Sequence, residues 1–107
     1  MDTIEITEAT RDAWHIVSVR GRVDGLTADR LEQALKAAVG AHPQVAVDCA
    51  AIDYISSAGL RSLLEGARAA QAAKRTFVLC APSARARQVF DISRLQQVLT
   101  IREDLPC

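Results

Sequence analysis

Apolar and polar residues follow two different periods along this chain, and the short-period segments predict strands. They cover residues 3–8, 14–20, 45–49, 76–80 and 98–102. Only a short polar turn separates the first segment from the second, which predicts an antiparallel hairpin. The run through Phe77, Val78 and Leu79 is continuously apolar, which suits a strand covered on both faces. The last segment is expected to be an edge strand.

A period of 3.6 residues predicts helices between the later strands. They run from Thr27 to about Gly40, from near Ser57 to about Ala73, from Pro82 and Ser83 onward, and over residues 92–97. Thr27 is a good N-cap for the first helix, whose apolar residues recur on one face. Because strands and helices alternate after the hairpin, the chain is predicted to be an α/β protein. We expect a mixed, mostly parallel sheet of about five strands with about four helices.

Length and composition fit a single domain over residues 1–107 with an aliphatic core. Half of the residues are apolar, but only one Trp, one Tyr and two Phe are aromatic. Acidic and basic residues balance at thirteen each, which argues against nucleic acid or an anionic membrane as a partner. The chain has neither a signal-peptide pattern at its start nor an apolar run of membrane-spanning length. We therefore expect a soluble protein in the cytoplasm.

The three cysteines do not indicate a disulfide framework or a zinc site. Their number is odd, and Cys49, Cys80 and Cys107 lie far apart in the sequence. Cys49 and Cys80 fall in apolar, strand-like runs and are expected to be buried as small hydrophobic residues. Cys107 is terminal and expected to be exposed.

Two adjacent serines, Ser56 and Ser57, are the most informative feature, because they stand between a predicted strand and a predicted helix. A hydroxyl at a helix start caps free backbone N–H groups. It can also carry a phosphate, because the positive end of the helix dipole favours an anion. Gly59 costs roughly 1 kcal/mol relative to alanine in a helical turn. Either it permits another surface to approach closely, or it is tolerated near the helix start.

The position of these serines in the predicted sheet favours a functional role. Ligands and partners of such sheets meet the carboxyl ends of the parallel strands. The loop before Ser57 lies at that end, and so does the loop over residues 81–83 that follows the fourth strand. The sequence alone does not place Asp24, in the loop after the second strand, relative to this end.

The chain lacks the patterns of the common catalytic and nucleotide-binding sites. It has no G-x-S-x-G elbow, Walker loop or G-x-G-x-x-G sequence. His15 falls in a strand and His42 beside a proline, and neither spacing brings it to the serines as a base. Asp24, Asp48 and Asp53 would have to converge to hold magnesium, but such residues more often face solvent at strand ends and in loops. No catalytic residue, metal or cofactor is therefore predicted.

Three segments, in order, resemble the STAS domain family, in particular the bacterial anti-sigma factor antagonists. The strongest is residues 47–60, similar to the family's strand–loop–helix signature, in which Asp-Ser-Ser/Thr-Gly-Leu carries the phosphorylated serine. Residues 21–24, Gly-Arg-Val-Asp, resemble its Gly-x-Leu-Asp loop. Residues 78–83 and 89–95 resemble its last strand and helix. The resemblance spans nearly the whole chain.

The resemblance assigns roles to individual residues. Ser57 occupies the position of the phosphoacceptor, and Asp24 matches the loop acid near it. The aspartate that often precedes the phosphoacceptor is Ser56 here, so this chain has a second candidate hydroxyl. The partner-binding surface implied by the resemblance consists of Asp24, Ser56, Ser57, Ala58, Gly59, Leu60 and Arg61.

The function implied by the resemblance is partner switching by a protein that is not itself an enzyme. The unmodified chain would bind an anti-sigma factor that is also a serine kinase of the histidine-kinase-like ATPase type, and so free the sigma factor. Phosphorylation of Ser57 would break the complex, and a PP2C-type phosphatase would restore it. The alternative is a STAS subunit of a lipid-transport or stress-sensing assembly that binds proteins without a phosphoswitch. A nucleotide-binding role is disfavoured, because the chain lacks a phosphate cradle.

Overall fold

The structure, a computed structural model, describes residues 4–105 and contains one five-stranded sheet. Its strands are β1 (Ile4–Arg11), β2 (Trp14–Val23), β3 (Gln44–Ile55), β4 (Thr76–Cys80) and β5 (Thr100–Arg102). The spatial order is β1-β2-β3-β4-β5. Strand β1 pairs antiparallel with β2, and the other neighbours are parallel. The predicted hairpin, the mixed and mostly parallel sheet, and the edge position of the last strand are all confirmed.

Three α-helices and one 3-10 turn lie within the described residues. They are α1 (Ala28–Ala41), α2 (Ser57–Ala72), α3 (Ala84–Ser93) and η1 (Leu95–Gln97). The short fourth helix predicted over residues 92–97 is present only over Leu95–Gln97, as a 3-10 turn, because α3 continues to Ser93. Arg94 adopts a left-handed conformation with φ of 57°, which ends α3, and a single 3-10 turn follows.

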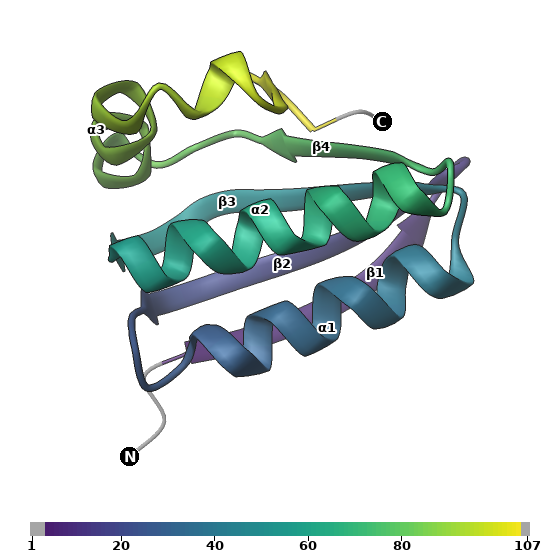
Figure 1. The fold of residues 1–107 in the computed structure, drawn as a ribbon, viewed down its shortest axis with the longest axis horizontal. Helices are drawn as coiled ribbons and strands as arrows, with labels where there is room; N and C mark the ends of the chain where they lie inside the picture. The colour runs from purple at the N-terminus through teal and green to yellow at the C-terminus, as the bar shows by residue number, and fades with distance from the viewer. Residues whose placement is uncertain (1–3, 106–107) are drawn as a thin grey trace.

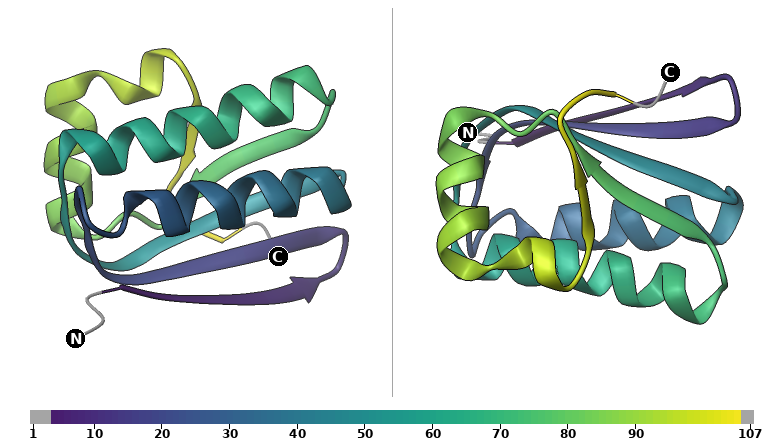
Figure 2. Two further views of the ribbon diagram at one scale, coloured as in Figure 1. Left: turned by 60° about the horizontal axis from the view of Figure 1, so that its bottom comes forward. Right: turned by 90° about the horizontal axis from the view of Figure 1, so that it is seen from above.

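The helices are distributed unevenly around the sheet. Helices α1 and α2 lie side by side on one face, and α3 lies across the end at which β3 stops (Figure 1). After β5 the chain runs back over the opposite face (Figure 2). There Leu105 and Trp14 pack against a small cluster made by Ile16, Ala46, Val78 and Cys80.

The main core is mostly aliphatic, as the composition predicts, with Phe77 and Phe90 as its aromatic members. Most of it lies between the sheet and the first two helices. Val17, Val47 and Leu79 from the strands are fully buried against Leu35 and Leu63 from the helices. Close helix packing here depends on a glycine of α2. A Cβ on Gly66 would lie 3.0 Å from the Leu35 side chain and 3.2 Å from Phe77.

The predicted burial of β4 on both faces and of two cysteines is confirmed. Phe77 and Leu79 join the main core while Val78 and Cys80 face the opposite cluster, so β4 is covered on both sides. Cys49 and Cys80 are both buried, and neither is in a disulfide. Burial raises the pKa of the Cys49 thiol well above its ordinary value. The prediction for Cys107 lies outside the described residues.

Strand β3 continues six residues beyond its predicted end at Cys49. Its pairing with β2 shifts twice, because Arg20 pairs with Ala51 and Arg22 with Tyr54. Each shift places an extra residue in β3, as in a β-bulge. Asp48 supports the first bulge, since its carboxylate accepts a hydrogen bond from the Ala50 backbone N–H at 3.0 Å. The extension carries β3 to the end of β2 and so determines where α2 begins.

Candidate functional site

The loop after β2 and the start of α2 meet at the carboxyl end of the sheet. Val23, the last residue of β2, pairs with Ile55, the last residue of β3. The Ser56 backbone N–H then donates to the Val23 carbonyl at 2.9 Å. The structure therefore places the Asp24 loop beside the two serines, which the sequence alone could not do.

Ser56 is the N-cap of α2. Its hydroxyl accepts a hydrogen bond from the Gly59 backbone N–H at 3.3 Å, and its carbonyl accepts from Leu60 at 2.9 Å. This side chain satisfies a helix N–H group that would otherwise have no partner within the helix. The hydroxyl of Ser56 is thus engaged in capping.

Ser57 differs from its neighbour in both exposure and bonding. It is the first residue of α2 and is exposed, and no hydrogen bond to its hydroxyl occurs within residues 4–105. The first turn of α2 contains no acidic residue. The positive end of the helix dipole therefore acts at this hydroxyl without a carboxylate in the same helical turn to neutralise it.

Gly59 faces the interior of the protein. A Cβ there would lie 2.7 Å from the Val23 carbonyl oxygen and 2.7 Å from Ile55 Cγ1. The close approach that this glycine permits is therefore between α2 and the ends of β2 and β3 in the same chain. The Ser62 hydroxyl, itself buried, donates to the Gly59 carbonyl at 2.6 Å and fixes this turn further.

Asp24 organises its own loop. One carboxylate oxygen accepts from the Leu26 backbone N–H at 3.0 Å, and the other lies 3.6 Å from Arg22 Nε. The hydrogen bond from Leu26 is the main reason that the pKa of Asp24 is lowered, with smaller contributions from Thr27 and Arg22. The Arg22 guanidinium also stacks 4.2 Å above the Tyr54 ring centre, which ties the loop to β3.

Thr27 occupies the N-cap position of α1, as the sequence predicts, but its hydroxyl makes no capping hydrogen bond. It donates to the Arg22 carbonyl at 2.9 Å and accepts from the Asp24 backbone N–H at 2.9 Å. Thr27 therefore closes the loop across its base and leaves the helix end to backbone bonds.

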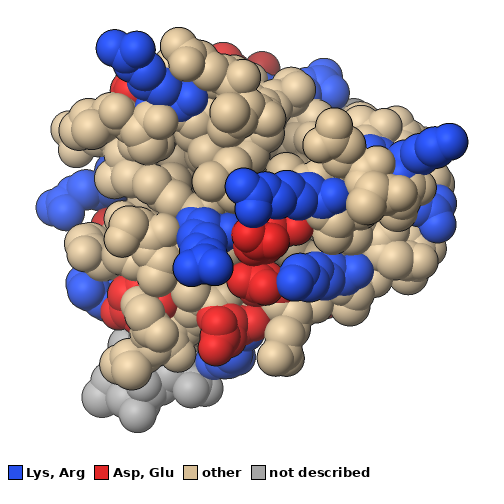
Figure 3. All heavy atoms as spheres, viewed as in Figure 1, with Lys and Arg blue, Asp and Glu red and all other residues tan. Residues whose placement is uncertain are grey.

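The other predicted site residues of α2 divide between surface and core. Ala58 and Arg61 line a groove of about 450 Å³ between the starts of α1 and α2, together with Gly25 and Ala28. Leu60 is half-buried and packs against the main core. Arg61 is exposed, and basic and acidic side chains lie interspersed over the face that α1 and α2 form (Figure 3).

Sequence reasoning missed Leu26, which is 92 % exposed on the same loop. The only signal available for it was an apolar residue inside a polar turn, Asp-Gly-Leu-Thr.

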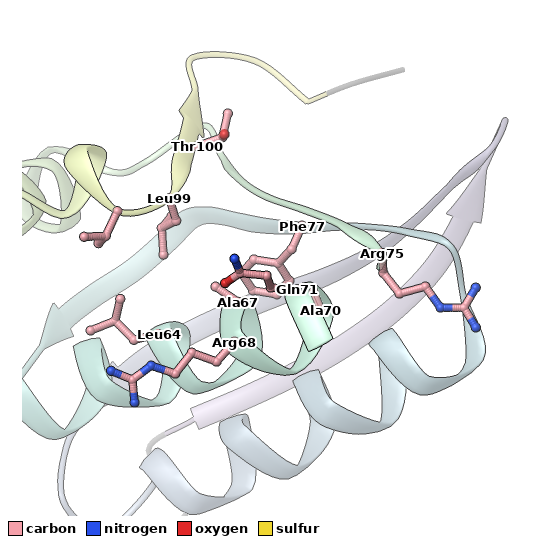
Figure 4. A pocket seen from close by; sticks show the side chains of 10 residues that line it. Leu64, Ala67, Arg68, Ala70, Gln71, Arg75, Phe77, Leu99 and Thr100 are labelled. Carbon is pink, nitrogen blue, oxygen red and sulfur yellow. The ribbon is translucent and has the colours of Figure 1, made fainter. Parts of the chain in front are cut away.

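A second groove lies away from these residues, along the later turns of α2. It has a volume of about 550 Å³ and lies between α2 and the segment that leads into β5. Leu64 and Leu99 point toward one another across it, with Phe77 at its floor (Figure 4). Gln71 lies in front of the Phe77 ring, and the groove is remote from Ser57 along the helix.

The two histidines lie at the other end of the sheet. His15 pairs with Val45 at the start of β3, whereas Ser57 follows the end of that strand. The rings of His15 and His42 stack 3.7 Å apart, and His15 Nε2 lies 2.6 Å from a Glu8 carboxylate oxygen. Neither histidine reaches the serines. Within residues 4–105, no three His, Cys, Asp or Glu side chains gather as a metal site would need, and no helix has the length and apolar character to cross a membrane.

Comparison with known proteins agrees with this architecture. A family model described as "Mlab, STAS domain" matches residues 6–102. A protein named as an anti-sigma factor antagonist, BtrV of Bordetella bronchiseptica, is 32% identical over 99 residues, which is 92% of this chain and 85% of the relative. The anti-sigma-F factor antagonist RsfB of Mycobacterium tuberculosis is 32% identical over 63 residues, 58% of this chain and 52% of the relative.

Solved structures show the same fold. An anti-sigma factor antagonist from Mycobacterium paratuberculosis superimposes with a TM-score of 0.86 at 26% identity, covering 95% of this chain and 87% of that one. SpoIIAA in its unphosphorylated form gives a TM-score of 0.72 at 19% identity, covering 92% of this chain and 86% of that one. Its phosphorylated form, from Bacillus, gives 0.69 at 18%, covering 91% and 90%.

The chain therefore belongs to the STAS domain family. Within that family its relatives are anti-sigma factor antagonists, which are regulatory binding proteins and not enzymes.

Proposed function

We propose that this protein is the antagonist in a partner-switching pathway of the cytoplasm and that Ser57 is its phosphorylation site. The unmodified protein binds an anti-sigma factor that is also a serine kinase of the histidine-kinase-like ATPase type, and the sigma factor is released. Transfer of the ATP γ-phosphoryl group to the Ser57 hydroxyl ends this binding. A PP2C-type phosphatase hydrolyses the ester and restores the binding form.

The single observation that carries the proposal is the contrast between the two serines. Ser57 is exposed and its hydroxyl has no partner within residues 4–105, whereas the Ser56 hydroxyl caps the helix. A kinase can reach the first without breaking a contact of the folded protein. SpoIIAA, a protein of the same fold, has been solved in unphosphorylated and phosphorylated forms, which supports a switch of this kind.

Charge provides the mechanism of release. A phosphate adds roughly −1.5 to −2 charges at neutral pH together with its hydration shell. A contact formed around a small neutral hydroxyl has to desolvate that dianion, which is costly unless a cation receives it. A loss of about 3 kcal/mol corresponds to roughly a hundredfold loss of affinity. Asp24, whose carboxylate is already committed to its own loop, adds negative charge to the same surface.

The partner surface in this proposal consists of the Asp24 loop and the first turn of α2. Ser57, Ala58 and Arg61 contact the partner directly, with Leu60 at the margin of the contact. Gly59 is buried and does not contact the partner, but it lets the first turn of α2 lie close to Val23 and so positions that turn. Ser56 holds that turn in register as its cap.

The test is a set of three variants against the ATPase-type anti-sigma factors of the host, purified and titrated one by one. Ser57→Asp is expected to lose at least a hundredfold in affinity, and Ser57→Ala to bind like the wild type but to accept no phosphate from ATP. Ser56→Ala is the control and should still gain one phosphate by intact mass. Binding of Ser57→Asp at wild-type strength would refute the switch, and complete loss of phosphate from Ser56→Ala would place it on the other hydroxyl.

A further inference from the structure

Leu26 is the most exposed of the large hydrophobic side chains within residues 4–105. Its exposed fraction is 92 %, compared with 84 % for Ile92, 68 % for Val98 and 39 % for Tyr54. A single exposed leucine is ordinary on a protein surface. Its significance here depends on how it is held and what surrounds it.

The backbone that carries Leu26 is held by several hydrogen bonds within a short loop. The Leu26 N–H donates to the Asp24 carboxylate, and the Asp24 carbonyl accepts from the backbone N–H groups of Thr27 at 3.1 Å and Ala28 at 2.8 Å. The Thr27 hydroxyl bridges Asp24 N and the Arg22 carbonyl. The side chain is thus presented on a fixed backbone, which lowers the conformational entropy lost when a partner binds it.

The surroundings of Leu26 have the composition of a binding site. The neighbouring groove between α1 and α2 has small residues along it, namely Gly25, Ala28 and Ala58, so a partner can approach the backbone closely. Charged residues of both signs line the rest of it, including Asp29 and Arg61. Leu26 does not itself line this groove but directly follows Gly25, which does. An exposed apolar residue therefore adjoins a polar patch, and protein interfaces combine these two kinds of surface.

Leu26 is also continuous with the proposed site of phosphorylation. The loop that carries it follows directly from Val23, whose carbonyl binds the Ser56 N–H, and the groove beside it includes Ala58, the residue after Ser57. One partner surface can therefore cover both Leu26 and Ser57.

We propose that Leu26 is the apolar anchor through which this protein binds its anti-sigma factor. Its side chain enters an apolar socket on the partner, the groove beside it receives partner side chains, and Ser57 lies within the same contact. This inference rests on the function proposed above. In this proposal Leu26 supplies affinity for the partner, and phosphorylation of Ser57 abolishes that affinity.

The experiment compares two exposed aliphatic residues, each replaced by a polar residue of similar shape. Leu26→Asn is the test, and Val98→Thr, in the groove along the later turns of α2, is the control. The host's purified ATPase-type anti-sigma factors are titrated against each variant by calorimetry. Leu26→Asn is expected to weaken binding about tenfold or more, as the burial of one leucine implies. Val98→Thr should stay within about twofold of the wild type.

Two further variants separate anchoring from structure and from the switch. Leu26→Met should regain affinity to within about threefold, and both Leu26 variants should melt at the wild-type temperature. If Leu26→Asn binds like the wild type while Ser57→Asp does not bind, the anchor is refuted and the switch stands. If Leu26→Asn is weakened while Ser57→Asp binds normally, the anchor stands and the switch fails. If no such factor binds the wild type, both proposals fail.

Discussion

Gly59→Ala tests whether this glycine is required by the fold. In a helix an alanine is more favourable than a glycine by up to about 1 kcal/mol, so propensity alone predicts a more stable protein. The structure predicts the opposite. The new Cβ would lie 2.7 Å from the Val23 carbonyl oxygen, 2.7 Å from Ile55 Cγ1 and 2.8 Å from Val23 Cγ1, where ordinary contact begins at 3.4 Å. The Val23 carbonyl oxygen and Ile55 Cγ1 must each move about 0.7 Å away from the new Cβ to reach ordinary contact.

The free-energy cost of that displacement decides whether Gly59→Ala stabilises or destabilises the protein. One of the opposing atoms belongs to backbone, and that carbonyl also accepts the Ser56 N–H, so it cannot turn away freely. Overpacking of this kind costs about 1–3 kcal/mol, and the helix gain offsets only part of it. All three contacts are at 2.8 Å or less, so we expect the cost to lie in the upper part of this range, about 2–3 kcal/mol. The net loss is then about 1–2 kcal/mol, which lowers Tm by about 4–9 °C for a domain of this size.

Gly40→Ala is the matched control, because Gly40 also lies in a helix but, apart from its chain neighbours and the backbone of its own helix, no atom lies within 4 Å of the place that its Cβ would take. It should raise stability by about 0.4–1 kcal/mol. Thermal and urea unfolding followed by circular dichroism measure both variants. If Gly59→Ala proves as stable as Gly40→Ala, the first turn of α2 is not packed as described.

Three further predictions concern the loop carboxylate, the cap of α3 and the exposed serine of α2. The pKa of Asp24 lies below its ordinary value of 3.8, so its stabilising effect is complete above about pH 4 and is lost as the pH falls through the folded-state pKa. Asp24→Asn should therefore flatten the acid side of a plot of urea midpoint against pH, and an unchanged slope would contradict this. Ser83→Ala removes the cap of α3 and a 2.7 Å hydrogen bond to the Ile52 carbonyl, which should cost about 1–2 kcal/mol in urea unfolding. Ser57→Ala, at an exposed position, should change stability by less than about 0.5 kcal/mol.

Periodicity predicts most of the fold because burial on one or two faces leaves a direct trace in the sequence. The predicted bounds of β4 are correct, and those of α2 lie within one residue at each end, since both elements are buried along most of one face. The end of β3 leaves no such trace. Its bulges break the alternation of apolar and polar residues, and Asp48 and Asp53 resemble loop residues.

Parts of the site are unpredictable for a different reason, because they depend on contacts between distant segments. The sequence indicates that Gly59 could permit a close approach, but only the packing of α2 on Val23 shows that the approaching surface belongs to the same chain. Thr27 is a residue type that often caps helices, yet its hydroxyl bonds to the Asp24 N–H and the Arg22 carbonyl instead. Exposure of Leu26 follows from the path of the loop and not from local pattern.

The rigidity of this corner bears on how a phosphoswitch would operate. The pairing of Val23 with Ile55, the Ser56 N–H bond to Val23 and the close contact at Gly59 fix the first turn of α2 on the sheet. A phosphate on Ser57 would meet the N-terminal end of that helix, where the dipole favours an anion, so it need not unfold the turn. The switch is then a change of surface charge on an unchanged scaffold. The phosphate would then affect binding only through direct contact with the partner. This requires Leu26, the proposed anchor, and Ser57 to lie within one interface.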